Sequence, residues 1–253
     1  MDSSTGRPAI EQLIRNIVQD RFTIRFLWTL LAFDLAFMTV IAARAFGLIW
    51  FVTGTGYLVI ATQLSLVTLV LLTGWWRCRC HEVMSLVLVS TILVAAKLFQ
   101  FHNLFGISIG ARVGIADLDL ATTAMIAVLT LAALLGLLMV LLLAIAWRRG
   151  DRQGRPILLL IGAALALTAT ASLAADIIVF ILTRLTSLDP DLLERAEQGV
   201  ELISATLLLT LTVGAMRVSW RPQPRSLRSR RSPTPPLRLK WTQTGIGRPR
   251  PPR

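Results

Sequence analysis

Long apolar stretches, separated by short segments rich in arginine or in turn-forming residues, dominate the chain between residues 24 and 216. Most of them reach about 20 residues, which at about 1.5 Å of rise per residue crosses the roughly 30 Å hydrocarbon core of a bilayer. They lack the strict apolar–polar alternation of a barrel strand, and a backbone exposed to lipid must satisfy its own hydrogen bonds. The pattern therefore predicts six membrane-spanning helices, over residues 24–46, 57–76, 83–101, 121–147, 157–183 and 201–216.

The expected fold is all-α, an integral membrane bundle in three parts. Residues 1–23 form an N-terminal segment, residues 24–220 the transmembrane domain, and residues 221–253 a tail. Within the N-terminal segment, residues 8–20 carry apolar side chains at helical spacing, which predicts a short amphipathic helix on the membrane surface. A soluble lead-in helix is the alternative. The apolar positions of this helix are Ile10, Leu13, Ile14, Ile17 and Val18.

Arginine predicts the orientation of the bundle. Groups of four, two, four and eleven Lys or Arg residues alternate with the predicted spans on one side, twenty-one in all, whereas four lie on the other side. Cytoplasmic loops carry the excess of basic residues, so both termini are expected to be cytoplasmic. Five of the seven tryptophans fall at the predicted cytoplasmic ends of spans, where the amphipathic indole ring is favoured. The expected location is the plasma (cytoplasmic) membrane.

The chain combines a high positive charge with a strongly apolar composition. The chain has 26 Lys and Arg against 14 Asp and Glu, a net charge of +12, yet 55% of its residues are hydrophobic and only 16% are charged. Residues 221–253 contribute ten of the basic residues, no acid and eight prolines, which predicts a disordered tail. We expect this tail to contact anionic lipid headgroups, at about 1 kcal/mol per basic residue near the surface. Nucleic acid is disfavoured as a partner, because a nucleic-acid-binding domain is not this apolar.

Three ionisable residues fall inside predicted spans: Asp34, Lys97 and Asp176. A charge inside the bilayer costs several kcal/mol, so each should face protein or water and is a candidate for an intramembrane polar site. Counted from the cytoplasmic ends, Asp34 lies near mid-membrane and the other two in the outer half, which makes Lys97 and Asp176 the expected pair. The alternative is structural, with carboxyl groups hydrogen-bonded between helices and Lys97 extended to the interface. Further polar residues that could line the site are Gln63, Thr168, Thr170 and Ser172.

Two further polar segments of the sequence are candidate sites. Residues 78–82 (Cys-Arg-Cys-His-Glu) hold four potential metal ligands, but they form one cluster without a second one, so no metal is expected; lipidation of a cysteine and a plain basic loop are the alternatives. Acidic residues recur at 191, 194, 197 and 201, which predicts an acidic helix face outside the membrane, solvated or attracting cations.

No sequence motif identifies an enzyme. The chain has no GxGxxG, Walker, nucleophile-elbow or paired-histidine motif, so no catalytic residue or cofactor is predicted. The favoured function is a small transporter or a channel-like subunit that uses Asp34, Lys97 and Asp176. The alternative is a scaffold, sensor or assembly module whose helices bind membrane-protein partners. An intramembrane enzyme is the least supported, because the spans lack clustered histidine or acid pairs.

Overall fold

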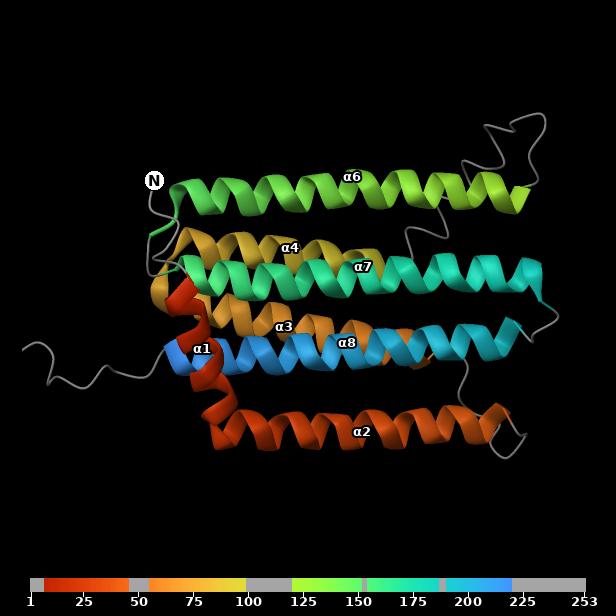
Figure 1. The fold of residues 1–253 in the computed structure, drawn as a ribbon, viewed down its shortest axis with the longest axis horizontal. Helices are drawn as coiled ribbons and strands as arrows, with labels where there is room; N and C mark the ends of the chain where they lie inside the picture. Colours follow the sequence, from red (N-terminus) through yellow and green to blue (C-terminus); the bar gives the residue numbers. More distant parts are fainter. Residues whose placement is uncertain (1–6, 46–54, 99–119, 152–153, 187–189, 220–253) are drawn as a thin grey trace, which may run out of the picture. The chain divides into compact units, whose positions relative to one another are not determined.

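The computed structural model of the chain describes residues 7–45, 55–98, 120–151, 154–186 and 190–219 (Figure 1). This part of the chain is entirely helical, with seven helices and no strand. The predicted tail, residues 221–253, lies outside the described residues. The helices are α1 (Arg7–Gln19), α2 (Arg21–Ala45), α3 (Thr55–Cys78), α4 (His81–Leu98), α6 (Leu120–Arg149), α7 (Arg155–Leu185) and α8 (Pro190–Ser219).

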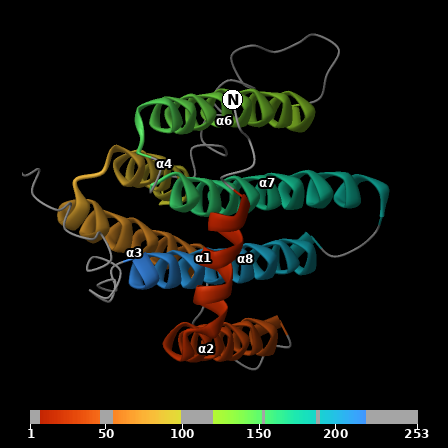
Figure 2. The ribbon, with the colours of Figure 1, turned by 60° about the vertical axis from the view of Figure 1, so that its left-hand side comes forward.

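Six helices, α2 to α8, are long and apolar enough to cross a membrane, which indicates an integral membrane protein. Each overlaps one of the six predicted spans, although α8 begins well before the predicted start at residue 201. The six helices lie side by side in both views while α1 crosses their ends (Figures 1 and 2). Their outward faces carry large apolar side chains, among them Trp28 at 67% exposed and Leu137 at 67%. Such surfaces suit hydrocarbon rather than water.

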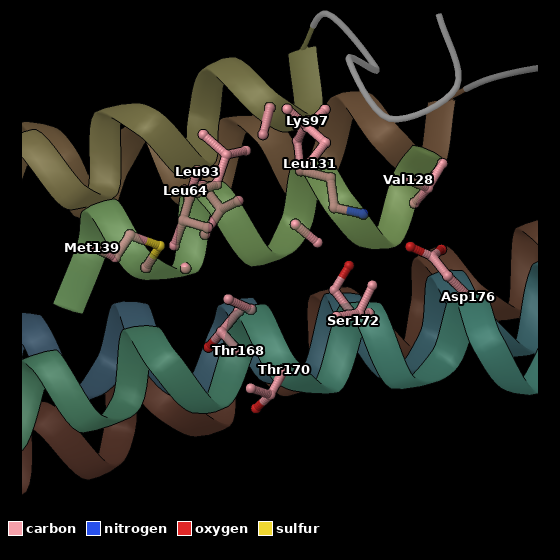
Figure 3. A pocket seen from close by; sticks show the side chains of 16 residues that line it. Leu64, Leu93, Lys97, Val128, Leu131, Met139, Thr168, Thr170, Ser172 and Asp176 are labelled. Carbon is pink, nitrogen blue, oxygen red and sulfur yellow. The ribbon is translucent and has the colours of Figure 1, made fainter. Parts of the chain in front are cut away.

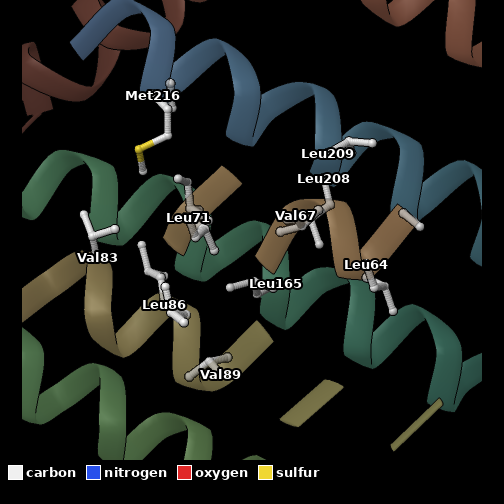
Figure 4. Close-up of a cluster of buried hydrophobic side chains, with 14 of the residues drawn as sticks. Leu64, Val67, Leu71, Val83, Leu86, Val89, Leu165, Leu208, Leu209 and Met216 are labelled. Atoms are coloured by element: carbon white, nitrogen blue, oxygen red, sulfur yellow. The ribbon is translucent and has the colours of Figure 1, made fainter. Parts of the chain in front are cut away.

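Helix α8 is the centre of the bundle although it comes last in the sequence. It packs against α1, α2, α3 and α7, and 61% of its membrane-spanning segment is buried, against 11% in α2. One face of α8 therefore supplies a stripe of core residues at helical spacing, and these belong to one buried cluster with leucines and valines of α3, α4 and α7 (Figure 4). The buried apolar residues of this stripe are Leu202, Ala205, Leu208, Leu209 and Met216.

The predicted N-terminal amphipathic helix forms as α1, and part of its apolar face packs on the bundle. Ile17 is 5% exposed, whereas Val18 is 61% exposed. A side chain on Gly214 of α8 would come within 2.8 Å of the Ile17 Cγ2 atom and 2.9 Å of the Thr23 Cγ2 atom, so α1 and the start of α2 approach α8 only because residue 214 is glycine. The position of α1 on a membrane surface stays a prediction.

Asp20 joins the start of α2 to the end of α8. Its Oδ2 atom accepts hydrogen bonds from the backbone N–H of Thr23, at 3.2 Å, and from the Thr23 hydroxyl, at 2.8 Å, which caps α2. The same oxygen lies 3.3 Å from Nε of Arg217 in the last turn of α8. The first and last spanning helices are therefore held together at the end of the bundle that carries α1.

Candidate functional site

An ion pair buried between α4 and α8 forms the centre of the candidate site. The ammonium group of Lys97, near the end of α4, contacts Oε1 of Glu201 in α8, and the two side chains are 14% and 2% exposed. The Ser172 hydroxyl of α7 donates a hydrogen bond to the same oxygen. The other carboxylate oxygen, Oε2, is buried and accepts no hydrogen bond from the described residues. Glu201 thus joins three helices and keeps one acceptor unsatisfied.

Two more carboxyl groups surround this pair. Asp176 of α7 and Glu197 of α8 each bring a carboxylate oxygen within 4.8 Å of the other and of a Glu201 oxygen. Glu197 precedes Glu201 by four residues and so lies on the same face of α8, with 9% of its surface exposed. We refer to Lys97, Asp176, Glu197 and Glu201 as the acid–lysine cluster.

The acid–lysine cluster contains more negative than positive groups. With one lysine and three carboxyl groups, it would carry two negative charges if all were ionised. Two carboxylates less than about 5 Å apart repel by about 3–4 kcal/mol even at an effective dielectric constant of about 20. Neighbouring carboxyl groups of this kind relieve the repulsion by sharing a proton or by binding a cation. Because the Lys97 ammonium lies at Glu201, Asp176 and Glu197 are the carboxyl groups of the cluster that this ammonium does not pair with.

A cavity of about 210 Å³ opens beside the cluster, between α4, α6 and α7 (Figure 3). Lys97, Ser172 and Asp176 lie together along it, and Leu93 and Met139 lie further from Asp176. Thr168 and Thr170 also line the cavity, from α7. Most of the remaining wall is apolar and comes from α6: Val128, Leu131, Ala132, Leu135 and Gly136.

Asp34 belongs to a second, separate polar group. Its carboxyl group accepts hydrogen bonds from Nε2 of Gln63 in α3, at 2.9 Å, and from the Thr206 hydroxyl of α8. The Gln63 amide nitrogen also donates to Oγ1 of Thr206, at 3.0 Å. All three residues are at most 4% exposed. We refer to Asp34, Gln63 and Thr206 as the Asp34 triad; it links α2, α3 and α8.

The structure brings two of the three candidate residues together. Lys97 and Asp176 line one cavity, whereas Asp34 lies in its own triad. The ion pair of Lys97 is with Glu201, whereas the sequence favoured Asp176 as its partner. Glu201 and Thr206 are five residues apart on α8, so the cluster and the triad are separated by about 7.5 Å along the helix axis.

The expectation that the acidic residues at the start of the sixth span face water is wrong for Glu197 and Glu201, which are buried. The α8 helix runs without a break from Pro190 to Ser219, and its buried face extends beyond the apolar segment. A signal for this was available in the sequence. Counting back from Met216 in steps of three or four residues leads through Thr212, Leu208 and Ala205 to Glu201.

Residues 78–82 form the turn between α3 and α4 and the start of α4, where the backbone N–H of Cys80 donates a hydrogen bond to the Cys78 sulfur at 3.2 Å. Arg79 has a left-handed backbone conformation (φ 54°), which closes the turn between α3 and α4. His81 is exposed, whereas Glu82 is buried. The Oε1 atom of Glu82 would lie 2.5 Å from a Cβ atom on Gly150 or on Gly154, so the carboxyl group packs closely against both glycines. Cys78 is exposed and Cys80 partly buried, both with free thiols.

No protein family, curated protein or solved structure matches the chain in comparisons of sequence and fold.

Proposed function

We propose that the chain is a small proton-coupled transporter or a channel-like subunit. The observation that carries the proposal is the acid–lysine cluster itself, three carboxyl groups and one lysine inside membrane-spanning helices beside a cavity. Ionisable groups are costly within a bilayer and mark proton or ion pathways when they occur there. A purely structural link between α4 and α8 would require only Lys97 and Glu201, and it leaves Asp176 and Glu197 unexplained.

In this proposal the four residues have different tasks. Lys97 neutralises Glu201 and, with the Ser172 hydroxyl, holds that carboxylate in place. Asp176 and Glu197 lie next to this fixed pair and share a proton, which they release when the site is open to a more alkaline side. The cavity between α4, α6 and α7 adjoins Asp176 and provides the space through which protons or solutes reach the pair.

The expected proton movement can be measured in vesicles. We reconstitute the full chain in phosphatidylcholine–phosphatidylglycerol liposomes that contain the pH dye pyranine, with an acidic interior and the membrane potential clamped by potassium and valinomycin. A channel-like subunit dissipates the gradient without added solute, and an alkali-cation exchanger does so when Na⁺ is added outside. Glu197→Gln should slow dissipation at least about tenfold, because an amide cannot carry the proton.

Glu194→Gln is the matched control. Glu194 lies on the same helix one turn earlier, is exposed, and accepts a hydrogen bond from the Tyr57 hydroxyl at 3.3 Å. Its replacement should leave the flux unchanged. A gradient that persists with the wild-type chain in all three conditions, without added solute, with Na⁺ outside and with a small organic cation outside, would overturn the proposal. Co-purification of a stoichiometric membrane-protein partner in that case would favour the assembly-module alternative.

The proposed orientation places both termini in the cytoplasm of a cell whose plasma membrane holds the protein. The support is the distribution of basic residues along the sequence, with twenty-one in segments predicted on one side of the membrane against four in segments predicted on the other. The tail, residues 221–253, would then contact the anionic lipids of the cytoplasmic leaflet.

Cys78 and Cys80 are the two cysteines of the chain and report its orientation without engineering. In intact cells, a membrane-impermeant maleimide should leave both thiols unlabelled; in inverted membranes it should label Cys78, which is exposed. Burial, followed by the neighbouring Cys78, raises the pKa of Cys80 to about 12. Because the thiolate is the reactive form, Cys80 should label slowly at pH 8 and faster only as the pH rises toward that value. Labelling of Cys78 in intact cells would contradict the proposed orientation and indicate the opposite one.

A further inference from the structure

The wall of the cavity is suited to an apolar group. Most of the residues contributed by α4 and α6 are alanine, leucine, valine and methionine, and Gly136 leaves open space where a side chain would begin. An apolar cavity of about 150 Å³ accepts a benzene ring, so a cavity of about 210 Å³ has room for such a ring and a small substituent. Protons and hydrated ions alone do not require an apolar wall of this extent.

The polar part of the cavity favours positive charge. Asp176 lines it, and Glu197 and Glu201 each place an oxygen within 4.8 Å of an Asp176 oxygen, while Lys97 is the single cation of the cluster. Glu201 is 2% exposed and its Oε2 atom has no hydrogen-bond donor among the described residues, so the single ammonium of Lys97 does not satisfy all the carboxylate oxygens of the cluster. An anionic ligand would be repelled by the same carboxylates.

We propose that the cavity binds a small lipophilic organic cation, whose positive group replaces the proton at Asp176 and Glu197 while its apolar part lies along α6. The inference rests on the proposed function in one respect, since the carboxyl pair that exchanges protons is the pair that binds the cation. One bound cation releases one proton, and charge is conserved at the site. A transporter built in this way exchanges protons for lipophilic cations.

Other charged and titratable groups near the pair come from α3, α4 and α8. Helix α4 supplies Lys97, and α8 supplies Glu201 together with the exposed Glu194. Helix α3 supplies Tyr57, which interacts electrostatically with Glu194, Glu197 and Glu201. Asp34 of α2 accepts hydrogen bonds from Gln63 and Thr206 and belongs to the separate Asp34 triad. Helix α6 has no ionisable residue between Leu120 and Trp147, so it contributes only its apolar face.

Equilibrium binding to the purified full-length chain tests the inference without requiring transport. The probe is benzyltrimethylammonium, a permanent cation with one aromatic ring, titrated by calorimetry in detergent between pH 5 and pH 8. Its Kd should fall by about tenfold for each unit that the pH rises, as long as one proton is displaced for each cation bound. Tetramethylammonium, which lacks the ring, and benzyl alcohol, which lacks the charge, should each bind at least about tenfold more weakly.

Two variants separate the charged part of the site from the apolar part. Glu197→Gln should weaken binding of the probe at least about tenfold and reduce its pH dependence, whereas Glu194→Gln should change neither. Gly136→Phe places a ring in open space inside the cavity and leaves every carboxyl group intact, so it should abolish binding of the probe without unfolding the chain.

Four results would overturn the inference: no binding of benzyltrimethylammonium, equal binding of benzoate, a Kd independent of pH, or unchanged binding to Gly136→Phe. A phospholipid that co-purifies in the cavity and is not displaced by the probe would also overturn it, since an acyl chain would then be the occupant. Proton flux without probe binding contradicts this inference alone. Probe binding without any proton flux contradicts the proposed function alone.

Discussion

Replacing Lys97 by methionine is expected to lower the free energy of unfolding by about 3–5 kcal/mol, the usual cost of removing one partner of a buried ion pair. Methionine matches the length of the lysine stem, so packing against α4 and α8 is largely preserved and the loss reports the missing charge. Glu201, 2% exposed, would remain among Asp176 and Glu197 without its neutralising ammonium. Unfolding by sodium dodecyl sulfate in mixed micelles, followed by tryptophan fluorescence, measures this loss.

The double variant Lys97→Met/Glu201→Gln is the matched control. It removes both charges of the pair and should recover most of the lost stability, because an amide is far less costly to bury than an unpaired carboxylate. Ser172 can still donate its hydrogen bond to the amide oxygen. A single variant Lys97→Met as stable as the wild-type chain would contradict the interpretation of Lys97 as the neutralising partner of Glu201.

The spans could be predicted because lipid imposes a simple requirement. A helix that crosses the hydrocarbon core must be apolar over about 20 residues, whatever it packs against, so hydropathy alone located α2 to α8. The arrangement of the helices could not be predicted in the same way. The side of α6 that faces lipid and the side that lines the cavity are both rich in leucine, so the pattern does not show which neighbours α6 meets.

The candidate site was predictable residue by residue but not pair by pair. Lys97 and Asp176 stand out because a charge inside a span is rare. Their proximity to Glu201 depends on α8 lying between α2, α3 and α7. This packing is determined by the shapes of side chains from several helices. Glu197 and Glu201 were missed because two acids close to the end of an apolar segment resemble the solvated start of a helix.

Loss of the Asp34 triad is expected to weaken the attachment of α2 to the rest of the bundle. This helix is the least buried of the six, and Asp34 is bound by both Gln63 and Thr206. Asp34→Leu should lower the free energy of unfolding by about 1–3 kcal/mol, since the Thr206 hydroxyl and the Gln63 amide both lose an acceptor in a buried environment. Asp34→Asn keeps an acceptor and should stay within about 1 kcal/mol of the wild-type chain.

Cross-linking between α2 and α8 separates this packing role from a proton-carrying one. Gly199 lies against the end of the Met38 side chain, so cysteines at these two positions, with Cys78 and Cys80 replaced by serine, can be joined by a short bis-maleimide. Asp34→Leu should reduce the cross-linking yield, and Asp34→Asn should preserve both the yield and the proton flux. If Asp34→Asn instead abolished the flux while the cross-link formed normally, Asp34 would belong to the proton pathway, and the path would run along α8 from Thr206 to Glu201.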